Sequence, residues 1–251
     1  MIPAAPPSCA KDGDRTMKTQ TKIGLKCFMA AAMTFCMVAV AELTGEKEII
    51  FPEIAALVTG AWLARKQPWN VSKTVLWITI TLSAFAGVAI VKHIHVSLPF
   101  QLALAFVFTM VILTAFGTTF VPIVCACILP VFIGTDSHVY TLSVSIMALI
   151  IIMVQHLLEK NGLHEKKAFE EIGISKQVLA RNAMRIALFL LVAMPPLYFG
   201  HLYFIAPPII VGYVELSDRN STARQSPLTI WLLFIVSSVL GYLAKEANIS
   251  M

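Results

Sequence analysis

The hydrophobic and polar positions of this chain follow one order three times: a long apolar span, a short apolar segment that contains proline, a turn, and a second long span. Apolar runs of about 20 residues with few charges are long enough to cross a bilayer as helices. The three copies cover about 24–94, 100–158 and 182–245. The pattern therefore predicts an all-α, polytopic helical membrane protein with about nine membrane segments.

The short segments carry the strongest indication of function. Each has 15 residues, and a helix of that length reaches about 22 Å against a hydrocarbon core of about 30 Å. Short segments interrupted by proline in corresponding places are a good sequence indicator of the binding site in a membrane transporter. The three segments are Ile49–Leu63, Thr119–Ile133 and Leu202–Leu216.

The number of segments per unit decides how the units are oriented. With three segments each, the first and second units are expected to be inverted relative to each other, and the third to run parallel to the first. A shared register supports the latter pair, because Trp77-x5-Ser83-x3-Gly87 recurs as Trp231-x5-Ser237-x3-Gly241. A fourth unit is missing from this symmetry. Either a second copy supplies it in a homodimer, or the chain is a truncated form of a longer one.

The composition agrees with a membrane protein and excludes other classes. Hydrophobic residues make up 58% and charged residues 13%, and the mean hydropathy is +0.80, whereas a soluble domain carries about 25% charged residues. Continuous apolar runs exclude a β-barrel, which would show short alternating segments. The net charge of +5 is spread over loops, so no nucleic-acid partner is expected. The five cysteines, mostly in apolar segments, predict no disulfide framework.

The basic residues are concentrated on one side of the expected membrane. Of the 19 lysines and arginines, all but Lys47, Lys92 and Lys245 fall in the loops on the side of the N-terminus. Cytoplasmic loops carry the excess of positive charge. We therefore expect a multi-pass protein of the plasma (inner) membrane, with its N-terminus in the cytoplasm and its C-terminus outside.

The chain divides into four parts on this pattern. Residues 1–22 form a polar cytoplasmic arm, 23–158 the first two membrane units, 159–182 a cytoplasmic linker, and 183–251 the third unit with a short outer tail. Residues 1–16 are polar and proline-rich, and Met17 opens a basic stretch before the first span. We expect natural translation to start at Met17, and the first span to be kept rather than cleaved as a signal peptide.

Glu53 is the most informative single residue, because it lies in the opening Phe51-Pro52-Glu53 of the first short segment. An acid at membrane depth is costly unless it faces protein or water, so it is a functional candidate by default. Two interpretations remain open. Glu53 lies at headgroup level and stabilises the positive end of a helix, or it takes part in proton coupling.

The openings of the other two short segments contain hydroxyl groups and prolines. Thr118 and Thr119 precede Pro122, and Pro207 lies near the start of the third segment. A threonine cap leaves N–H groups near a helix start that suit a small anion, and capping alone explains the threonines as well. The prolines fit helix starts and turns.

No catalytic or metal-binding arrangement stands out. Cys125 and Cys127 would point about 200° apart around a helix, which is a poor chelate. The histidines are scattered, and the chain has no HExxH, no GxxxxGK and no Ser–His–Asp arrangement. The sequence therefore predicts no enzyme activity, no metal and no cofactor.

Between about Ile49 and Glu159 the order of features resembles the His-Pro-Pro (HPP) family of small integral membrane proteins. In that family a short stretch rich in proline and small residues precedes a Gln-Pro-x-Asn loop, matched here by FPEIAALVTG and Gln67-Pro68-Trp69-Asn70. The family's His-Pro-Pro is replaced by Thr119-Phe120-Val121-Pro122, with one proline and no histidine, and a Leu-Pro-Val-x-x-Gly turn follows at Leu129 to Gly134. The family looks like a transporter group, and some members are linked to nitrite uptake in chloroplasts. The resemblance implies a small anionic substrate.

Two functions are compatible with these observations. The first is a membrane transporter or channel-like protein for a small solute, an anion being the class that the resemblance implies; its partners would be the bilayer, the solute and a second copy of the chain. The second is a non-transporting membrane subunit that scaffolds or regulates a partner through the linker 159–182. The expected substrate path of the first is lined by Glu53, Gln67, Asn70, Thr118, Thr119, Pro122 and Pro207.

Overall fold

The computed structural model describes residues 9–64, 67–163, 169–170, 172–173, 175–201, 206–217 and 226–247. All regular structure in these ranges is helical, which confirms the predicted all-α class. The elements are α1 (Cys9–Thr44), η1 (Lys47–Ile49), α2 (Ile54–Val58), η2 (Thr59–Leu63), α3 (Lys73–His93), α4 (Leu98–Ala115), α5 (Ile123–Ile133), α6 (His138–Lys160), α7 (Lys176–Tyr198), α8 (Pro207–Ser217) and α10 (Pro227–Ala247).

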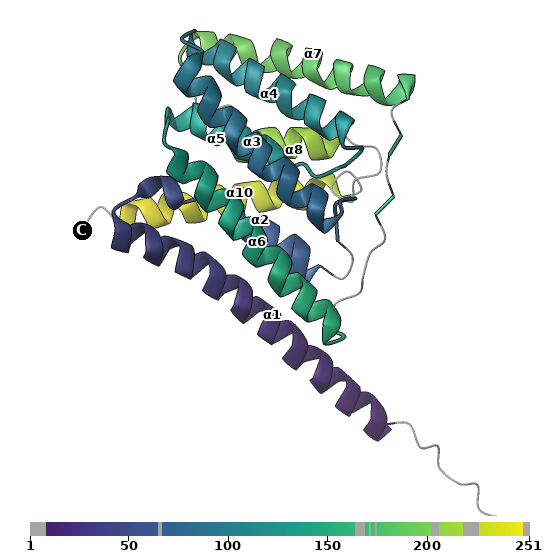
Figure 1. Ribbon diagram of the computed structural model, residues 1–251. Helices are drawn as coiled ribbons and strands as arrows, with labels where there is room; N and C mark the ends of the chain where they lie inside the picture. Colours follow the sequence, from purple (N-terminus) through teal and green to yellow (C-terminus); the bar gives the residue numbers. More distant parts are fainter. Residues whose placement is uncertain are drawn as a thin grey trace, which may run out of the picture.

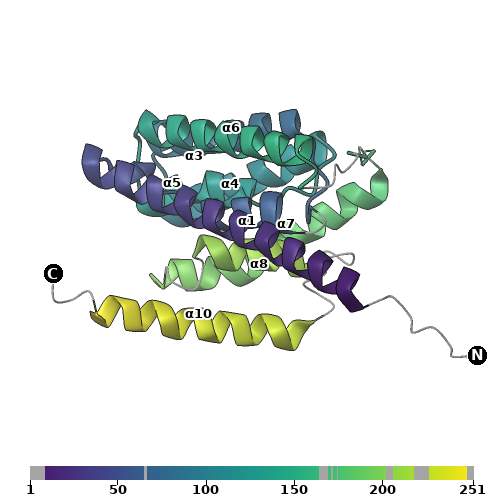
Figure 2. The same ribbon diagram turned by 90° about the horizontal axis from the view of Figure 1, so that it is seen from below.

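The long helices α1, α3, α4 and α6 slope the same way across the view of Figure 1, α7 and α10 lie closer to horizontal, and α5 and α8 lie among them. Viewed from below, α10 lies at one outer face of the bundle and α6 at the opposite face (Figure 2). The start of α1 and the end of α10 lie at opposite ends of the bundle. An odd number of membrane crossings between the start of α1 and the end of α10 would place them at opposite ends in this way.

Five helices are long and apolar enough to cross a membrane: Ile23–Thr44 within α1, and α3, α4, α6 and α7. This supports a multi-pass membrane protein. The apolar part of α10, Leu228–Leu243, is shorter. Its large side chains are mostly exposed, as are many of those on α1. Such faces suit contact with lipid.

The short helices are shorter than the predicted 15 residues. α5 and α8 have 11 residues each, which corresponds to about 17 Å of helix. The first short segment has a five-residue α-helix followed by a five-residue π-helical turn. The residues immediately before Pro52, Pro122 and Pro207 are not helical, because proline disfavours the helical conformation of the residue before it and starts a helix readily. The beginning of the third segment, residues 202–205, lies outside the described residues.

The polar arm expected over residues 1–22 is helical from Cys9 onward, because α1 spans Cys9–Thr44. Residues 1–8 lie outside the described part of the chain.

The core of the bundle is built around α5. Every residue of α5 from Ile123 to Val131 is buried, and the helix packs against α3, α4 and α8. Gly87 of α3 allows the closest approach. A Cβ atom built there would lie 2.6 Å from Cγ of Pro130, and closer still to the carbonyl oxygen of Cys127. The two helices can therefore touch only because residue 87 has no side chain.

Pro130 inside α5 creates a hydrogen-bonding problem that Tyr140 solves. Proline has no N–H, so the carbonyl four residues earlier, that of Ala126, loses its partner within the helix. The hydroxyl of Tyr140, at the start of α6, donates to the Ala126 oxygen at 3.0 Å. Gly134 then ends the helix with a φ of 71°, as expected of a left-handed C-terminal residue.

We expect Tyr140→Phe to lower the stability of the bundle, because the buried Ala126 oxygen then has no donor. An unsatisfied buried acceptor costs about 1–3 kcal/mol. The change should appear as a lower Tm of the purified protein in detergent. Tyr242→Phe is the control, because Tyr242 of α10 is 62% exposed. An unchanged Tm for Tyr140→Phe would contradict this role of the hydroxyl.

Candidate functional site

Three of the residues predicted from the sequence meet where α3 begins and α4 ends. The hydroxyl of Thr118 donates to the carbonyl oxygen of Asn70 at 2.7 Å, and the backbone N–H of Thr119 reaches the same oxygen at 3.3 Å. In return, the N–H of Asn70 donates to Oγ1 of Thr119 at 2.9 Å. These bonds join the loop before α3 to the loop before α5, and we call the contact the Asn70 junction.

The linker after α6 is also bound at the Asn70 junction. The side-chain amide of Asn70 donates to the carbonyl of Glu170 and accepts from its N–H at 3.2 Å, so the amide pairs with that residue's backbone on both sides. The N–H of Ile172 donates to the carbonyl of Gly117 at 3.1 Å. The polar groups of Asn70, Thr118 and Thr119 are therefore engaged in holding three chain segments together.

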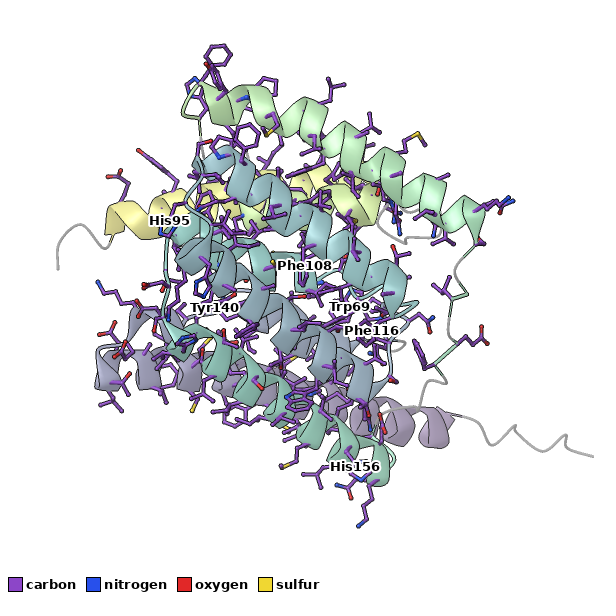
Figure 3. The ribbon with its side chains drawn as sticks, turned by 45° about the horizontal axis from the view of Figure 1, so that its top comes forward. Trp69, His95, Phe108, Phe116, Tyr140 and His156 are labelled. Atoms are coloured by element: carbon purple, nitrogen blue, oxygen red, sulfur yellow. The ribbon has the colours of Figure 1, made fainter. Side chains whose placement is uncertain are left out.

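Next to the junction lies a pocket of about 320 Å³, which we call the polar hollow. Gln67, another predicted residue, contributes to its wall and is 8% exposed. His156, which is exposed, lies at the rim of the hollow. Figure 3 shows His156 near the end of α6, with Trp69 and Phe116 toward the same end of the bundle. His95 lies at the opposite end. The hollow is lined by Gln67, Val71, Ser72, Lys73, Gln155, His156, Glu159 and Phe169.

An ion pair and an amide form the buried wall of the polar hollow. Nζ of Lys73 lies 2.6 Å from Oε2 of Glu159, whose side chain is only 4% exposed. Gln155, one helical turn earlier on α6, donates from Nε2 to the other oxygen of Glu159 at 3.2 Å. Oε1 of Gln155 is buried and has no hydrogen-bond partner among the residues that the structure describes. This oxygen is enclosed behind the wall of the hollow.

Trp69 connects the hollow's loop to two short helices. Its ring lies on Gly60 of η2, where a Cβ atom would be 2.6 Å from Cζ3 of the indole. The ring also meets Phe120 edge to face, with centroids 5.3 Å apart. Its Nε1 donates to Glu215 of α8 at 3.5 Å. The Gln67–Asn70 loop thus contacts elements from all three predicted units.

Glu53 lies apart from this group. It follows Pro52 just before α2, and its carboxyl group interacts with the thiol of Cys125 on α5. Oε2 of Glu53 is buried without a hydrogen-bond partner in the described part of the chain. Phe51 stacks edge to face on Tyr140 with centroids 6.3 Å apart, and Figure 3 shows Tyr140 toward the end of the bundle away from Trp69. The structure therefore does not bring Glu53 to the Asn70 junction.

Pro122 and Pro207 are both buried and both mark helix starts. Pro122 immediately precedes α5, and its carbonyl accepts the N–H of Ala126 at 3.2 Å. Pro207 is the first residue of α8. Their observed contribution is to fix where the short helices begin, since neither side chain offers a polar group.

Sequence reasoning missed several polar residues inside the bundle. Besides Lys73, Gln155 and Glu159, these include Asn182 and Arg185 on α7. Nδ2 of Asn182 donates to Oγ1 of Thr114 at 2.7 Å, and Nη1 of Arg185 donates to Asn182 at 3.3 Å. The signal was a spacing of three or four residues between polar groups on helices that are otherwise apolar, since such residues share one face.

The described polar side chains at this site offer hydrogen-bond donors and acceptors. Among them, no three histidine, cysteine or acidic residues lie close enough together to hold a metal ion. The Asn70 junction fixes the loops, and the polar hollow beside it is concave and contains charged groups. No family model, no curated protein and no solved structure matches this chain.

Proposed function

We propose that this chain is a membrane transporter or channel-like protein for a small polar solute. The observation that carries the proposal is Glu53, a carboxyl group inside an apolar bundle whose Oε2 is buried and has no hydrogen-bond partner among the described residues. An ionisable group within membrane-spanning helices is costly and is retained mainly on solute or proton pathways. Glu53 is the proposed site of proton or solute coupling, and this extends the second of the two interpretations given above.

The order of the helices supports a path along the short segments. Long, short and long helices follow one another three times, as α1, α2–η2, α3; then α4, α5, α6; then α7, α8, α10. In our proposal these nine segments form three units, of which the first two are inverted, in the plasma membrane with the N-terminus in the cytoplasm. Transporters of this kind bind solutes where short or broken helices meet between repeats.

The proposed solute path includes Gln67 and the Asn70 junction. The Gln67–Asn70 loop that suggested a relation to the His-Pro-Pro family contacts elements of all three units. The residues of this loop are the basis on which we propose a distant relation to that family and, through it, a small solute. A homodimer remains part of the proposal, because the exposed α10 leaves the third unit open on one face.

The alternative is a non-transporting subunit that scaffolds or regulates a partner. Two observations favour it. α5 is closely packed, because Gly87 of α3 lies against its backbone. The hydroxyl groups of Thr118 and Thr119 are already hydrogen-bonded to the backbone of Asn70. The linker that would bind the partner is itself held on the bundle through Glu170 and Ile172.

The test is uptake by proteoliposomes that contain the full chain, with and without a pH gradient. The solutes are nitrite, nitrate, formate, glycine and acetamide. We expect uptake of at least one solute, and we expect Glu53→Gln to reduce it at least tenfold because the titratable carboxyl is lost. Thr119→Val, which removes the acceptor for the Asn70 N–H, should reduce it as well.

Glu46→Gln is the matched control, because Glu46 lies in an exposed turn. Circular dichroism and gel filtration establish that each variant is folded. Uptake that survives both Glu53→Gln and Thr119→Val would leave a transporter with a different path. The absence of uptake for every solute would contradict the proposal and favour the subunit.

A further inference from the structure

We propose that a groove between α3 and α4 binds one phospholipid molecule, with an acyl chain along the groove and the phosphate at the end where α3 terminates. The proposal goes beyond the proposed function and does not depend on what the chain transports. It requires only that α3 and α4 lie in the membrane, and both helices are long and apolar enough to cross one.

The α3–α4 groove lies along one face of α3. Its volume is about 420 Å³, within the roughly 300–1,000 Å³ typical of ligand pockets. Leu104 and Phe108, four residues apart on α4, form one wall. The α3 residues of the other wall recur at spacings of three and four, so they share one side of the helix. They are Leu82, Phe85, Ala86, Ala89, Ile90 and His93.

Small side chains keep the α3–α4 groove open. Ala86 and Ala89 each carry a single methyl group, so neither can fill the space toward α4. Gly87 lies on a different face of α3 and allows that helix to approach α5 closely. Leu82 and Phe85 are exposed, so the groove opens outward from the bundle. Since this surface belongs to two membrane-spanning helices, the molecules around it are lipids.

The length of the α3–α4 groove matches one leaflet of the bilayer. From Leu82 to His93 the helix rises about 17 Å, and half of the hydrocarbon core measures about 15 Å. Figure 3 shows His95, which follows α3, at one end of the bundle, and Phe108 of the groove farther from that end. An acyl chain that enters beside His93 therefore reaches Leu82 near the middle of the membrane.

Basic side chains at this end of α3 provide a partner for the phosphate. Lys92, His93 and His95 are all exposed. Nζ of Lys92 contacts Nε2 of His138 at 3.2 Å, and because an ammonium group has three donors, it can bind a phosphate oxygen as well. Residues 73–116, which include both helices of the groove, contain no acidic residue. The charge of this end is therefore complementary to a phospholipid headgroup.

Contact on two sides distinguishes this lipid from the others around the protein. A chain that lies against a convex face, such as the exposed face of α10, touches protein on one side only. A chain in the α3–α4 groove touches both helices at once, and its phosphate adds a contact with Lys92. We therefore expect this lipid to stay bound when detergent removes the surrounding ones.

The test is native mass spectrometry of the full chain, extracted with a mild detergent from vesicles of phosphatidylglycerol and phosphatidylcholine. We expect one phospholipid to remain bound per chain. Ala89→Phe fills the groove with a ring and should reduce the retained lipid at least tenfold. Ala31→Phe is the matched control, because Ala31 is exposed in the span of α1 and lies outside the groove.

A second variant and a second readout cover the case in which Ala89→Phe does not fold. Lys92→Glu changes an exposed residue, so it should fold, and repulsion of the phosphate should lower the retained phosphatidylglycerol at least threefold. Lys47→Glu is its control, because Lys47 is exposed in η1 outside the groove. Phosphatidylglycerol with a photoreactive group on its acyl chain should label peptides of α3 and α4 more strongly than those of α10.

Four results would each overturn the proposal. The first is a purified chain that retains no phospholipid, whether as a monomer or as a dimer. The second is retention of a fatty acid in place of a phospholipid. The third is retention that is equal in each variant and its control. The fourth is photolabelling of α10 as strong as that of α3 and α4.

Discussion

Gly87→Ala is expected to destabilise the bundle more than any other single methyl group added to a described helix. The new Cβ would meet the carbonyl of Cys127 and the ring of Pro130. Backbone and a proline ring cannot rotate away, so α3 and α5 must separate. Overpacking of this kind costs about 1–3 kcal/mol, and the upper end applies here because α5 is buried on all sides.

The measurement is the Tm of purified protein in detergent, with α5 burial followed by the reactivity of its thiols. Cys125 and Cys127 are buried and reduced, and we expect them to react faster in Gly87→Ala. The control is Gly241→Ala on α10, the position that the sequence register pairs with Gly87. No atom lies within 4 Å of a Cβ at Gly241, so alanine there should be neutral or slightly stabilising. Equal Tm values for the two variants would contradict the close packing of α3 on α5.

Lys73→Met is the second change with a large expected effect. It leaves the carboxylate of Glu159, only 4% exposed, without its cation. Removing one partner of a buried ion pair costs about 3–5 kcal/mol, and the loss should be smaller here because the Lys73 side chain keeps 33% of its surface exposed. We expect a lower Tm of the purified protein in detergent.

A double variant separates the charge effect from loss of packing. In Lys73→Met with Glu159→Gln, no unpaired charge remains, so most of the lost stability should return. Lys176→Met is the matched control. Lys176, like Lys73, is the first residue of a helix that a serine caps, but it is exposed. A double variant as unstable as Lys73→Met would show that the ion pair is not the source of the effect.

The helical class and the long spans could be predicted because they depend on local composition. A run of about 20 apolar residues identifies a membrane helix whatever surrounds it. The bounds of the short helices were harder to predict from the sequence. Proline shifted each start toward the C-terminus, so that α5 begins at Ile123 rather than Thr119.

The site could be predicted only in part, because its contacts join distant parts of the chain. Thr118 and Thr119 were selected as polar residues at the opening of a short segment, and Gln67 and Asn70 from the loop that resembles the His-Pro-Pro family. The structure places all four in or beside one junction. Their bonding to one another across about 50 residues follows from helix packing and has no local signal. Gln155 and Glu159 were overlooked because polar residues at the end of a span usually lie at the membrane surface.

The position of α5 has a consequence for how the protein is made. A helix of 11 residues is about half as long as the hydrocarbon core, so the bilayer alone gives it no stable transmembrane position. α3 and α4 precede it during synthesis, but α8 and the Tyr140 hydroxyl that satisfies its free carbonyl emerge from the ribosome later. Insertion of this chain therefore cannot proceed as a series of independent helices, and α5 reaches its final place only after the helices on both sides of it in the sequence have entered the membrane.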